Sequence, residues 1–474
     1  MTDHGTPDGS APAVRERDYL INVYQPKKYD DGSMSIVSAD GCWVTTAGGH
    51  RMLDLHGQHM CLGVGHRHPR LVAALHQAVD GLDYAADFVA HEGKTRAAKL
   101  LIEQTMTTDW AGGVRFVSSG SEGTEMAMLI ARLYTNRPII VTRDLGFHGW
   151  TAAASAATGV ASRRNVFTTE SGEVRPVPSP HAPYPAAPAP LCGSCPLNQS
   201  YPNCKDADGT LACVTATERV FRSVGVEQIA GFITEIWHGA GAFLPPDEYV
   251  PQIRELTSRL GILWIDDESI GGPARTGHWW AFQHYGVNPD IVTMAKGLTS
   301  AAVPAGACVV SREISDFMDS GWWAHGSTFS GHPLACAAIV ANLEIILDEN
   351  LVERAGELGR FVEPRLQSMV ERHPSVSGFT GRGLLWGIEL VKDPATGERW
   401  VPADRRHNQA VDGPIEFSPG GFVAHECAMR GVLLFNYSPN TVTIAPPLLI
   451  TEEELEIGLT AIDEALDQLD KQMP

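Results

Sequence analysis

The stretch DIVTMAKGLTSAAVPAG, residues 290–306, contains a single lysine, Lys296, which follows a run of β-branched and apolar residues typical of a buried strand. Glycine and other small residues come after it. A lysine ammonium is strongly hydrated and normally lies in water, so the end of a buried strand is an unusual place for one. Desolvation favours the uncharged amine, which is a nucleophile. We therefore interpret Lys296 as a reactive amine at the edge of a buried sheet.

Short apolar runs alternate with helical patterns on both sides of this lysine. Most of these runs are apolar on both faces, as parallel strands with helices on both sides require. The pattern predicts an α/β fold with a mostly parallel sheet, whose ligands bind at the carboxyl ends of the strands. The predicted strands are 114–119, 138–143, 231–236, 261–266, 291–295, 307–311, 381–391 and 442–450, with helices at 121–136, 245–260 and 451–469.

A small-residue turn, SSGSEGTE (118–125), joins the first of these strands to a helix. Ser119, Gly120 and Ser121 would allow the backbone to approach an anion, and N–H groups at a helix N-terminus would point toward it. Many strand-to-helix turns are rich in glycine and serine without binding anything. The turn is therefore a candidate phosphate site that needs support from elsewhere.

Two further motifs follow predicted strands. In LGFHGWT (145–151), Phe147 either packs in the core beside a turn or stacks on a flat ligand ring. In WIDDESIGG (264–272), Asp267 either caps the next segment or holds a proton on a ligand's ring nitrogen. Together with Lys296 and the phosphate turn, these motifs describe pyridoxal 5′-phosphate (PLP), an aldehyde with a phosphate, a planar ring and a pyridine nitrogen.

Five motifs of this chain agree in order and spacing with those of a known family. They are SSGSEGTE (118–125), FHG (147–149), DES through RTG (267–277), PDI through AKG (289–297) and TFSGHP (328–333). With them the chain resembles the class III aminotransferases, PLP-dependent enzymes of fold type I. The similarity extends from about residue 30 to the last helix and is closest to the taurine:pyruvate and amine:pyruvate subgroup.

The resemblance implies a role for individual residues. Lys296 would form the Schiff base, Asp267 would bind the pyridine nitrogen, and Thr328 would reach the cofactor phosphate of a neighbouring subunit. The active unit would then be a homodimer, or a tetramer. The cofactor-binding residues implied are Ser119, Gly120, Ser121, Phe147, His148, Glu235, Asp267, Ser269, Lys296 and Thr328.

The resemblance also implies a division into domains. Residues 76–335 would form the large PLP-binding domain, interrupted by an insertion rich in proline and cysteine at about 176–215. The N-terminal segment 18–75 and the C-terminal part 336–474 would form a smaller α+β domain. We read residues 1–17 as a flexible tail, because they are polar and rich in glycine and proline.

The chain departs from the family at the positions that bind a substrate carboxylate. Thr443 stands where ornithine-type relatives carry an arginine paired with the glutamate at Glu235, and no arginine follows Gly431. Ser269 replaces a usual valine, and its hydroxyl either weakens apolar packing or adds a hydrogen bond. Two functions stay open: transfer of an amino group from a primary amine or ω-amino acid to a keto acid such as pyruvate, or a PLP-dependent lyase, decarboxylase or epimerase reaction.

Four of the nine cysteines, Cys192, Cys195, Cys204 and Cys213, lie within the insertion. Their number would suit structural zinc, but only one pair has the short C-x-x-C spacing. Reduced thiols or a disulfide together account for the pattern better than zinc does. The other cysteines are scattered, as in reduced core thiols.

Composition restricts the partners of the protein. A net charge of −20 argues against nucleic acid, which requires basic surfaces. No apolar stretch approaches the roughly 20 residues of a membrane helix, and the polar N-terminus does not resemble a signal peptide. We therefore expect a cytoplasmic enzyme that acts on small molecules, an amine donor and a keto-acid acceptor.

Overall fold

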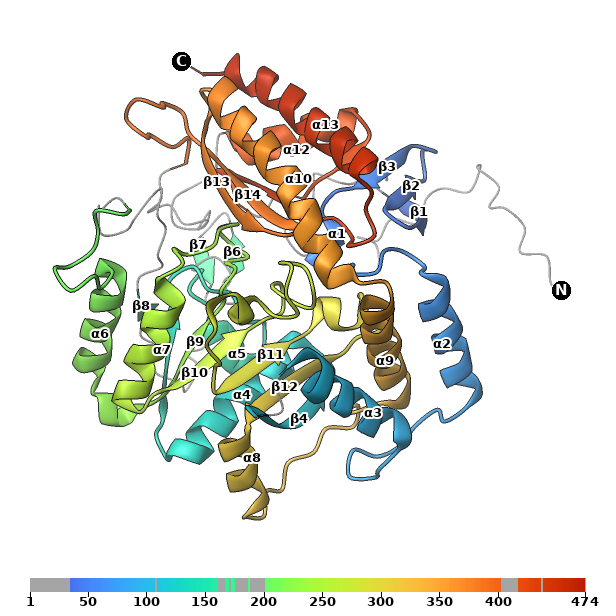
Figure 1. Cartoon of the computed structure of the whole chain (residues 1–474), viewed down its shortest axis with the longest axis vertical. Helices are drawn as coiled ribbons and strands as arrows, with labels where there is room; N and C mark the ends of the chain where they lie inside the picture. Colours follow the sequence, from blue (N-terminus) through green and yellow to red (C-terminus); the bar gives the residue numbers. More distant parts are fainter. Residues whose placement is uncertain are drawn as a thin grey trace.

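A computed structural model describes residues 35–106, 109–160, 201–401, 417–435 and 438–473, together with the backbone of the short strands β6, β7 and β8. Figure 1 shows a large sheet with flanking helices in one half of the molecule and the C-terminal helices in the other. No helix in these ranges combines the length and the apolar composition that a membrane span requires.

The large sheet has seven strands in the order β4-β12-β11-β10-β9-β5-β8. All neighbouring pairs are parallel except those of β12, which runs antiparallel to both β4 and β11. The prediction of a mostly parallel α/β sheet is confirmed. The strands are β4 (Ala111–Val117), β5 (Ile139–Arg143), β8 (Ala186–Ala187), β9 (Ile229–Thr234), β10 (Leu263–Asp267), β11 (Ile291–Met294) and β12 (Gly306–Ser311).

Alternating residues of these strands enter two cores on opposite faces of the sheet. Phe232 and Trp264 belong to the core that also contains residues of α7 and α9, whereas Ile233 and Ile265 belong to the core beneath α4. Because side chains alternate along a strand, a sheet covered on both faces needs apolar residues at successive positions. The helices around this sheet are α2 (Pro69–Asp80), α3 (Glu92–Leu100), α4 (Gly120–Thr135), α5 (Ala152–Ala156), α6 (Ala212–Val224), α7 (Tyr249–Leu260), α8 (Arg312–Asp319) and α9 (Pro333–Asp348).

The N-terminal and C-terminal parts of the chain share a third core. It contains Leu53 and Leu55 together with residues of the long C-terminal helices, such as Leu358 and Leu466. In Figure 1 the blue strands β1–β3 accordingly lie beside the red helix α13. The elements are β1 (Ile36–Asp40), β2 (Trp43–Thr46), β3 (Arg51–Asp54), α1 (Gly57–Met60), α10 (Leu351–Arg372), β13 (Val376–Arg382), β14 (Leu385–Leu390), α12 (Pro419–Met429), β15 (Val432–Leu433), β16 (Thr441–Ile444) and α13 (Glu452–Asp470).

Two smaller sheets belong to this half, in the orders β1-β2-β3-β15 and β13-β14-β16. A further pair, β6 (Phe167–Thr169) and β7 (Gly172–Val174), is antiparallel. Helix α13 begins with the capping box of Thr451 and Glu454, and three acidic residues in its first turn favour the positive end of the helix dipole. The predicted final helix is therefore confirmed.

Some predicted boundaries are wrong for local reasons. The run 381–391 is not one strand, because Gly383 has a φ of +58° and forms the turn between β13 and β14. The run 442–450 ends as a strand at Ile444, two residues before the consecutive prolines. The end of the predicted insertion packs into the folded part of the chain, because Leu211, Cys213 and Val214 are buried in the core.

Candidate active site

Lys296 lies immediately beyond β11, at the start of a short 3-10 helix. Its φ of +43° is left-handed, a conformation that costs a non-glycine residue about 1 kcal/mol. The buried side chain of Asn342 on α9 stabilises this turn, because its Nδ2 donates to the carbonyls of Gly297 at 2.9 Å and Leu298 at 3.0 Å. The lysine is half-buried, less enclosed than the sequence suggested.

Asp267 ends β10, the neighbouring strand, and its carboxylate is buried. Nδ1 of His148 lies 3.0 Å from Oδ2 of Asp267, and the backbone N and Oγ of Ser269 donate to Oδ1 at 3.2 and 2.6 Å. Burial alone would raise the pKa of Asp267, but the hydrogen bonds and the charges of His148 and Lys296 lower this pKa below its ordinary value. Asp267 is therefore an ionised carboxylate at neutral pH.

A second pair of buried acids, Asp266 and Glu268, lies on either side of Asp267 in the chain. Burial and then the charge of Glu268 raise the pKa of Asp266 well above its ordinary value. Burial likewise raises the pKa of Glu268 to about 7, although the hydrogen bond from the amide of Phe282, at 3.1 Å, acts in the opposite direction. Asp266 and Glu268 therefore hold their protons to a higher pH than ordinary acids do, whereas Asp267 keeps its charge.

Glu268→Gln should remove part of the pH dependence of stability. Between the ordinary value of 4.5 and about 7, the folded protein holds a proton that the unfolded chain has released, so stability falls as the pH rises through this range. From pH 5.5 to 8.5 we expect wild type to lose roughly 2 kcal/mol of unfolding free energy relative to the variant. Urea unfolding at both pH values measures this, with the exposed Glu363→Gln as control. Parallel pH curves for wild type and Glu268→Gln would contradict the raised pKa of Glu268.

The predicted phosphate turn forms the N-terminus of α4. Ser119 is the N-cap, and its Oγ accepts from the backbone N of Glu122 at 3.2 Å. The amides of Gly120 and Ser121 have no acceptor within the described ranges, as expected for the first turn of a helix. A Cβ on Gly120 would lie 3.2 Å from the Cβ of Ala295, the residue before the lysine. This turn therefore offers two amides beside the lysine strand.

The loop after β5 carries Phe147 and His148. The backbone N of Phe147 donates to Oε2 of Glu235 at 2.8 Å, and the amide of Gly239 donates to Oε1 of the same carboxylate at 3.4 Å. Glu235 is buried, and burial raises its pKa. Its oxygens thus accept from backbone amides, and this loop is anchored to the end of β9.

Thr443, which stands where ornithine-type relatives carry an arginine, is buried in the structure. Thr443 lies in β16, opposite Gly387 of β14. Arg275 is also buried, but its guanidinium donates to the backbone carbonyls of Leu62, Leu384 and Pro446, at 3.0, 3.4 and 2.8 Å. This arginine joins the N-terminal and C-terminal parts to the large sheet and is not available to a substrate.

Most of the predicted site residues therefore gather at the carboxyl ends of β4, β5, β9, β10 and β11. Thr328 is different, because it lies on an exposed loop and no hydrogen bond in the described ranges joins it to the others. Cys204 and Cys213 carry free thiols. Cys192 and Cys195 lie outside the described residues, so the preference for reduced thiols or a disulfide over zinc stays a prediction.

The arrangement fits PLP. Nε2 of His148 is buried and has no partner within the described ranges, two amides at the start of α4 are open to an anion, and Gly120 leaves room where a side chain would crowd Ala295. The ionised carboxylate of Asp267 suits a protonated pyridine nitrogen, and Lys296 supplies the amine that an aldehyde requires. Together with the sheet order, these side chains define a PLP-dependent enzyme of fold type I.

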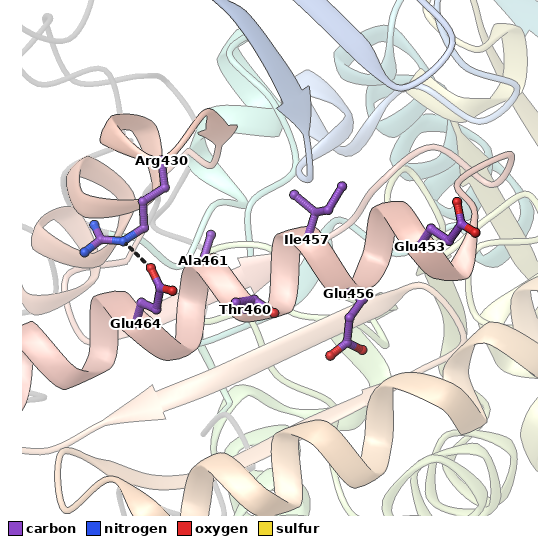
Figure 2. A pocket seen from close by; sticks show the side chains of 7 residues that line it. All are labelled: Arg430, Glu453, Glu456, Ile457, Thr460, Ala461 and Glu464. Atoms are coloured by element: carbon purple, nitrogen blue, oxygen red, sulfur yellow. Dashed lines mark hydrogen bonds and ion pairs between the residues drawn. The ribbon is translucent and has the colours of Figure 1, made fainter.

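A pocket elsewhere on the molecule is lined by several carboxylates and differs in this from the predicted cofactor site. Figure 2 shows it along α13, where Glu453 and Glu456 extend from the helix and Nε of Arg430 lies 3.0 Å from Oε2 of Glu464. None of the predicted cofactor residues lines it, and its carboxylates would repel a phosphate. It is therefore not the cofactor site.

Comparison with known proteins identifies the family. The chain belongs to the class III aminotransferases, whose family model matches residues 24–466. An S-selective transaminase from Bacillus megaterium superposes with a TM-score of 0.89 at 38% identity, covering 96% of this chain and 97% of that chain. A taurine:2-oxoglutarate aminotransferase from Bifidobacterium kashiwanohense, in complex with PLP and glutamate, gives 0.85 at 29% identity with the same coverage.

Curated relatives agree with this assignment. A putrescine–pyruvate aminotransferase from Pseudomonas aeruginosa is 30% identical over 93% of this chain and 91% of its own length. Others of similar identity are named acetylornithine aminotransferases, one of them from Mycolicibacterium smegmatis. The protein is thus a PLP-dependent aminotransferase, and a lyase, decarboxylase or epimerase reaction is not favoured.

Proposed function

We propose that this aminotransferase moves an amino group from a primary amine or an ω-amino acid to a keto acid such as pyruvate. The observation that carries the proposal is that the glutamate–arginine pair which usually holds the substrate carboxylate is incomplete in this chain. Glu235 accepts from the amides of Phe147 and Gly239, and its expected arginine partner is replaced by the buried Thr443. A donor that carries no carboxylate beside its amine does not need the hydrogen bonds that such an arginine would supply.

Several similar proteins support this substrate class, and acetylornithine, whose free amine is its ω-amine, also falls within it. S-selective transaminases and the putrescine–pyruvate and taurine enzymes are all similar to this chain over nearly its whole length. Putrescine and taurine carry an amine on a carbon without a carboxylate. The chemistry of these donors therefore agrees with a site in which the buried Thr443 stands in place of the carboxylate-binding arginine.

Each residue of the site has a role in this reaction. PLP, when bound, accepts the amino group at its aldehyde carbon and withdraws electrons from the substrate through its ring. Lys296 would hold the cofactor covalently, and its Nζ would later take the proton from the substrate carbon that bears nitrogen. The amides of Gly120 and Ser121 would bind the phosphate, and Phe147 would pack on the ring.

Asp267 would keep a proton on the ring nitrogen, which makes the ring an electron acceptor. His148 and Ser269 do not face the reaction in this scheme. They donate to the two oxygens of Asp267 and so preserve its negative charge inside the protein. The hydroxyl of Ser269, whose purpose the sequence left open, thus forms a hydrogen bond with the acid.

The proposal includes a homodimer, in which Thr328 of one subunit reaches the cofactor phosphate of the other. Large apolar side chains near this loop are unusually exposed in the single chain: Phe88 at 88%, Trp322 at 91% and Phe329 at 58%. Exposed apolar groups of this size are typical of subunit contacts. A tetramer, a cytoplasmic location and the domain boundaries given above stay predictions.

The decisive test uses the enzyme loaded with PLP and an amine donor alone. Conversion of the cofactor to pyridoxamine phosphate, measured by mass spectrometry, is expected with putrescine, taurine or 1-phenylethylamine. Pyruvate should then restore the aldehyde form, and 2-ketoglutarate serves as the alternative acceptor. Conversion by α-amino acids such as L-alanine but by none of these three donors would refute the proposed substrate class, and donor turnover without any amination of the cofactor would favour a lyase reaction.

A further inference from the structure

The exposed residue Thr328 lies at the corner of a tight turn. The backbone N of Ser330 donates to the carbonyl of Ser327 at 3.0 Å, so Thr328 and Phe329 are the two central residues of this turn. Both are exposed, whereas Ser330 is buried. The turn therefore projects two side chains away from the subunit that carries it.

The carboxylate of Asp87 holds the residues before the turn in place through hydrogen bonds. Its Oδ2 accepts from the backbone N of Ser327 at 3.2 Å and from Nη2 of Arg115 on β4 at 2.6 Å. The same Nη2 donates to the carbonyl of His325 at 3.1 Å. Asp87 and Arg115 together thus hold both ends of the segment 325–327 against the large sheet.

The residues after the turn are held by other hydrogen bonds, which do not involve Asp87. Oγ of Ser330 donates to the carbonyl of Phe116 at 2.6 Å, and Nε2 of His91 lies 2.7 Å from the carbonyl of Gly331. Loss of Asp87 would therefore free only the first half of the turn. The second half would keep it attached, so a variant at Asp87 should remain folded.

We propose that Asp87 is a positioning residue for the cofactor site of the neighbouring subunit, through the turn that carries Thr328. The inference rests on the proposed function, which assigns Thr328 to the partner's phosphate. Asp87 is suited to this role because its side chain is only 11% exposed and has a charge-assisted bond to Arg115. The hydrogen bonds from Ser327 and Arg115 outweigh burial and lower the pKa of Asp87, so it is ionised at neutral pH.

The first measurement is the affinity for PLP. Apoenzyme of Asp87→Ala should need about tenfold more PLP for half-saturation, as expected from the loss of one hydrogen bond to the phosphate. Asp83→Ala is the matched control and should bind as wild type does, because it lies in the same segment and its one hydrogen bond within the described ranges joins it to its neighbour Tyr84. Asp87→Asn, which keeps one oxygen, should lie between the two. If Asp87→Ala does not fold, Arg115→Gln carries the same prediction.

The second measurement determines in which subunit of the dimer the affinity for PLP is reduced. Mixed dimers are prepared from two differently tagged chains, and borohydride followed by mass spectrometry counts PLP attached at Lys296. In a dimer of Asp87→Ala with Lys296→Ala, the one competent lysine faces an intact turn and should load with wild-type affinity. In a dimer of wild type with the double variant, the competent lysine faces the altered turn and should need about tenfold more PLP.

The opposite order of affinities would overturn the proposal, because the defect would then belong to the altered subunit itself. Wild-type affinity in both mixtures, or a monomeric wild-type enzyme, would overturn it as well. Failure of the proposed function is seen differently. It would appear as a Lys296→Ala homodimer that still aminates its cofactor, or as wild type that refuses every amine donor.

Discussion

Lys296→Ala is expected to reduce turnover with an amine donor and pyruvate by at least about 10⁴-fold, the upper range for loss of a positioned acid-base group. The reason is that this one amine both attaches the cofactor and moves the substrate proton. Borohydride reduction followed by peptide mass spectrometry should label Lys296 in wild type and nothing at that position in the variant. Stopped-flow absorbance of the half-reaction separates chemistry from product release.

The control for this variant is Lys99→Ala. Lys99 is an exposed lysine on α3 whose only ion pair within the described ranges joins it to Glu103 at 3.7 Å. It should behave as wild type in both assays. Turnover of Lys296→Ala within tenfold of wild type would show that another amine does the work, and the assignment of the site would fail.

Asp267→Asn is expected to lower kcat by roughly 10² to 10³-fold, the range seen when one preorganised electrostatic group is removed. The amide cannot balance a proton on the ring nitrogen, so the ring withdraws electrons poorly. Lys296 remains, and the variant should still bind PLP and be labelled by borohydride. Its single-turnover rate, measured with saturating donor, tests the prediction, with the exposed Asp316→Asn as control.

The pH dependence sharpens this prediction. Because the pKa of Asp267 lies below its ordinary value of 3.8, its contribution to stability is present above 3.8 and is lost only as the pH falls through the lower folded value. Asp267 is therefore charged throughout the range from about pH 6 to 9. Asp267→Asn should lower the rate by the same factor across this range. An acidic limb that disappears in the variant would contradict an ionised Asp267.

Much of the cofactor site could be predicted from the sequence, because its motifs are local. Lys296 and Asp267 each follow a strand that is apolar on both faces, and such strands place their carboxyl ends at one edge of a parallel sheet. The turn at 118–125 was recognisable because small residues join a predicted strand to a helical pattern. The missing arginine at Thr443 required only the order of residues.

The supporting residues could not be predicted in the same way. Asn342 has no motif around it, and it holds the turn after Lys296 from 45 residues away in the chain. Asp87 and Ser327 are 240 residues apart. A single buried amide or half-buried carboxylate looks the same in a sequence whether it holds a functional loop or an ordinary one, so only its partners reveal its purpose.

By itself, the sequence determined which strands are buried, that Lys296 and Asp267 each follow one of them, and to which family of enzymes the chain belongs. Hydrophobic periodicity and short motifs encode these features within a few residues. Only the tertiary structure decided that His148 and Ser269 keep Asp267 charged, that Glu235 serves backbone amides, and that Asp87 holds the turn of Thr328. Hydrogen bonds between distant segments depend on distances of a few ångströms, and these exist only once the chain has folded.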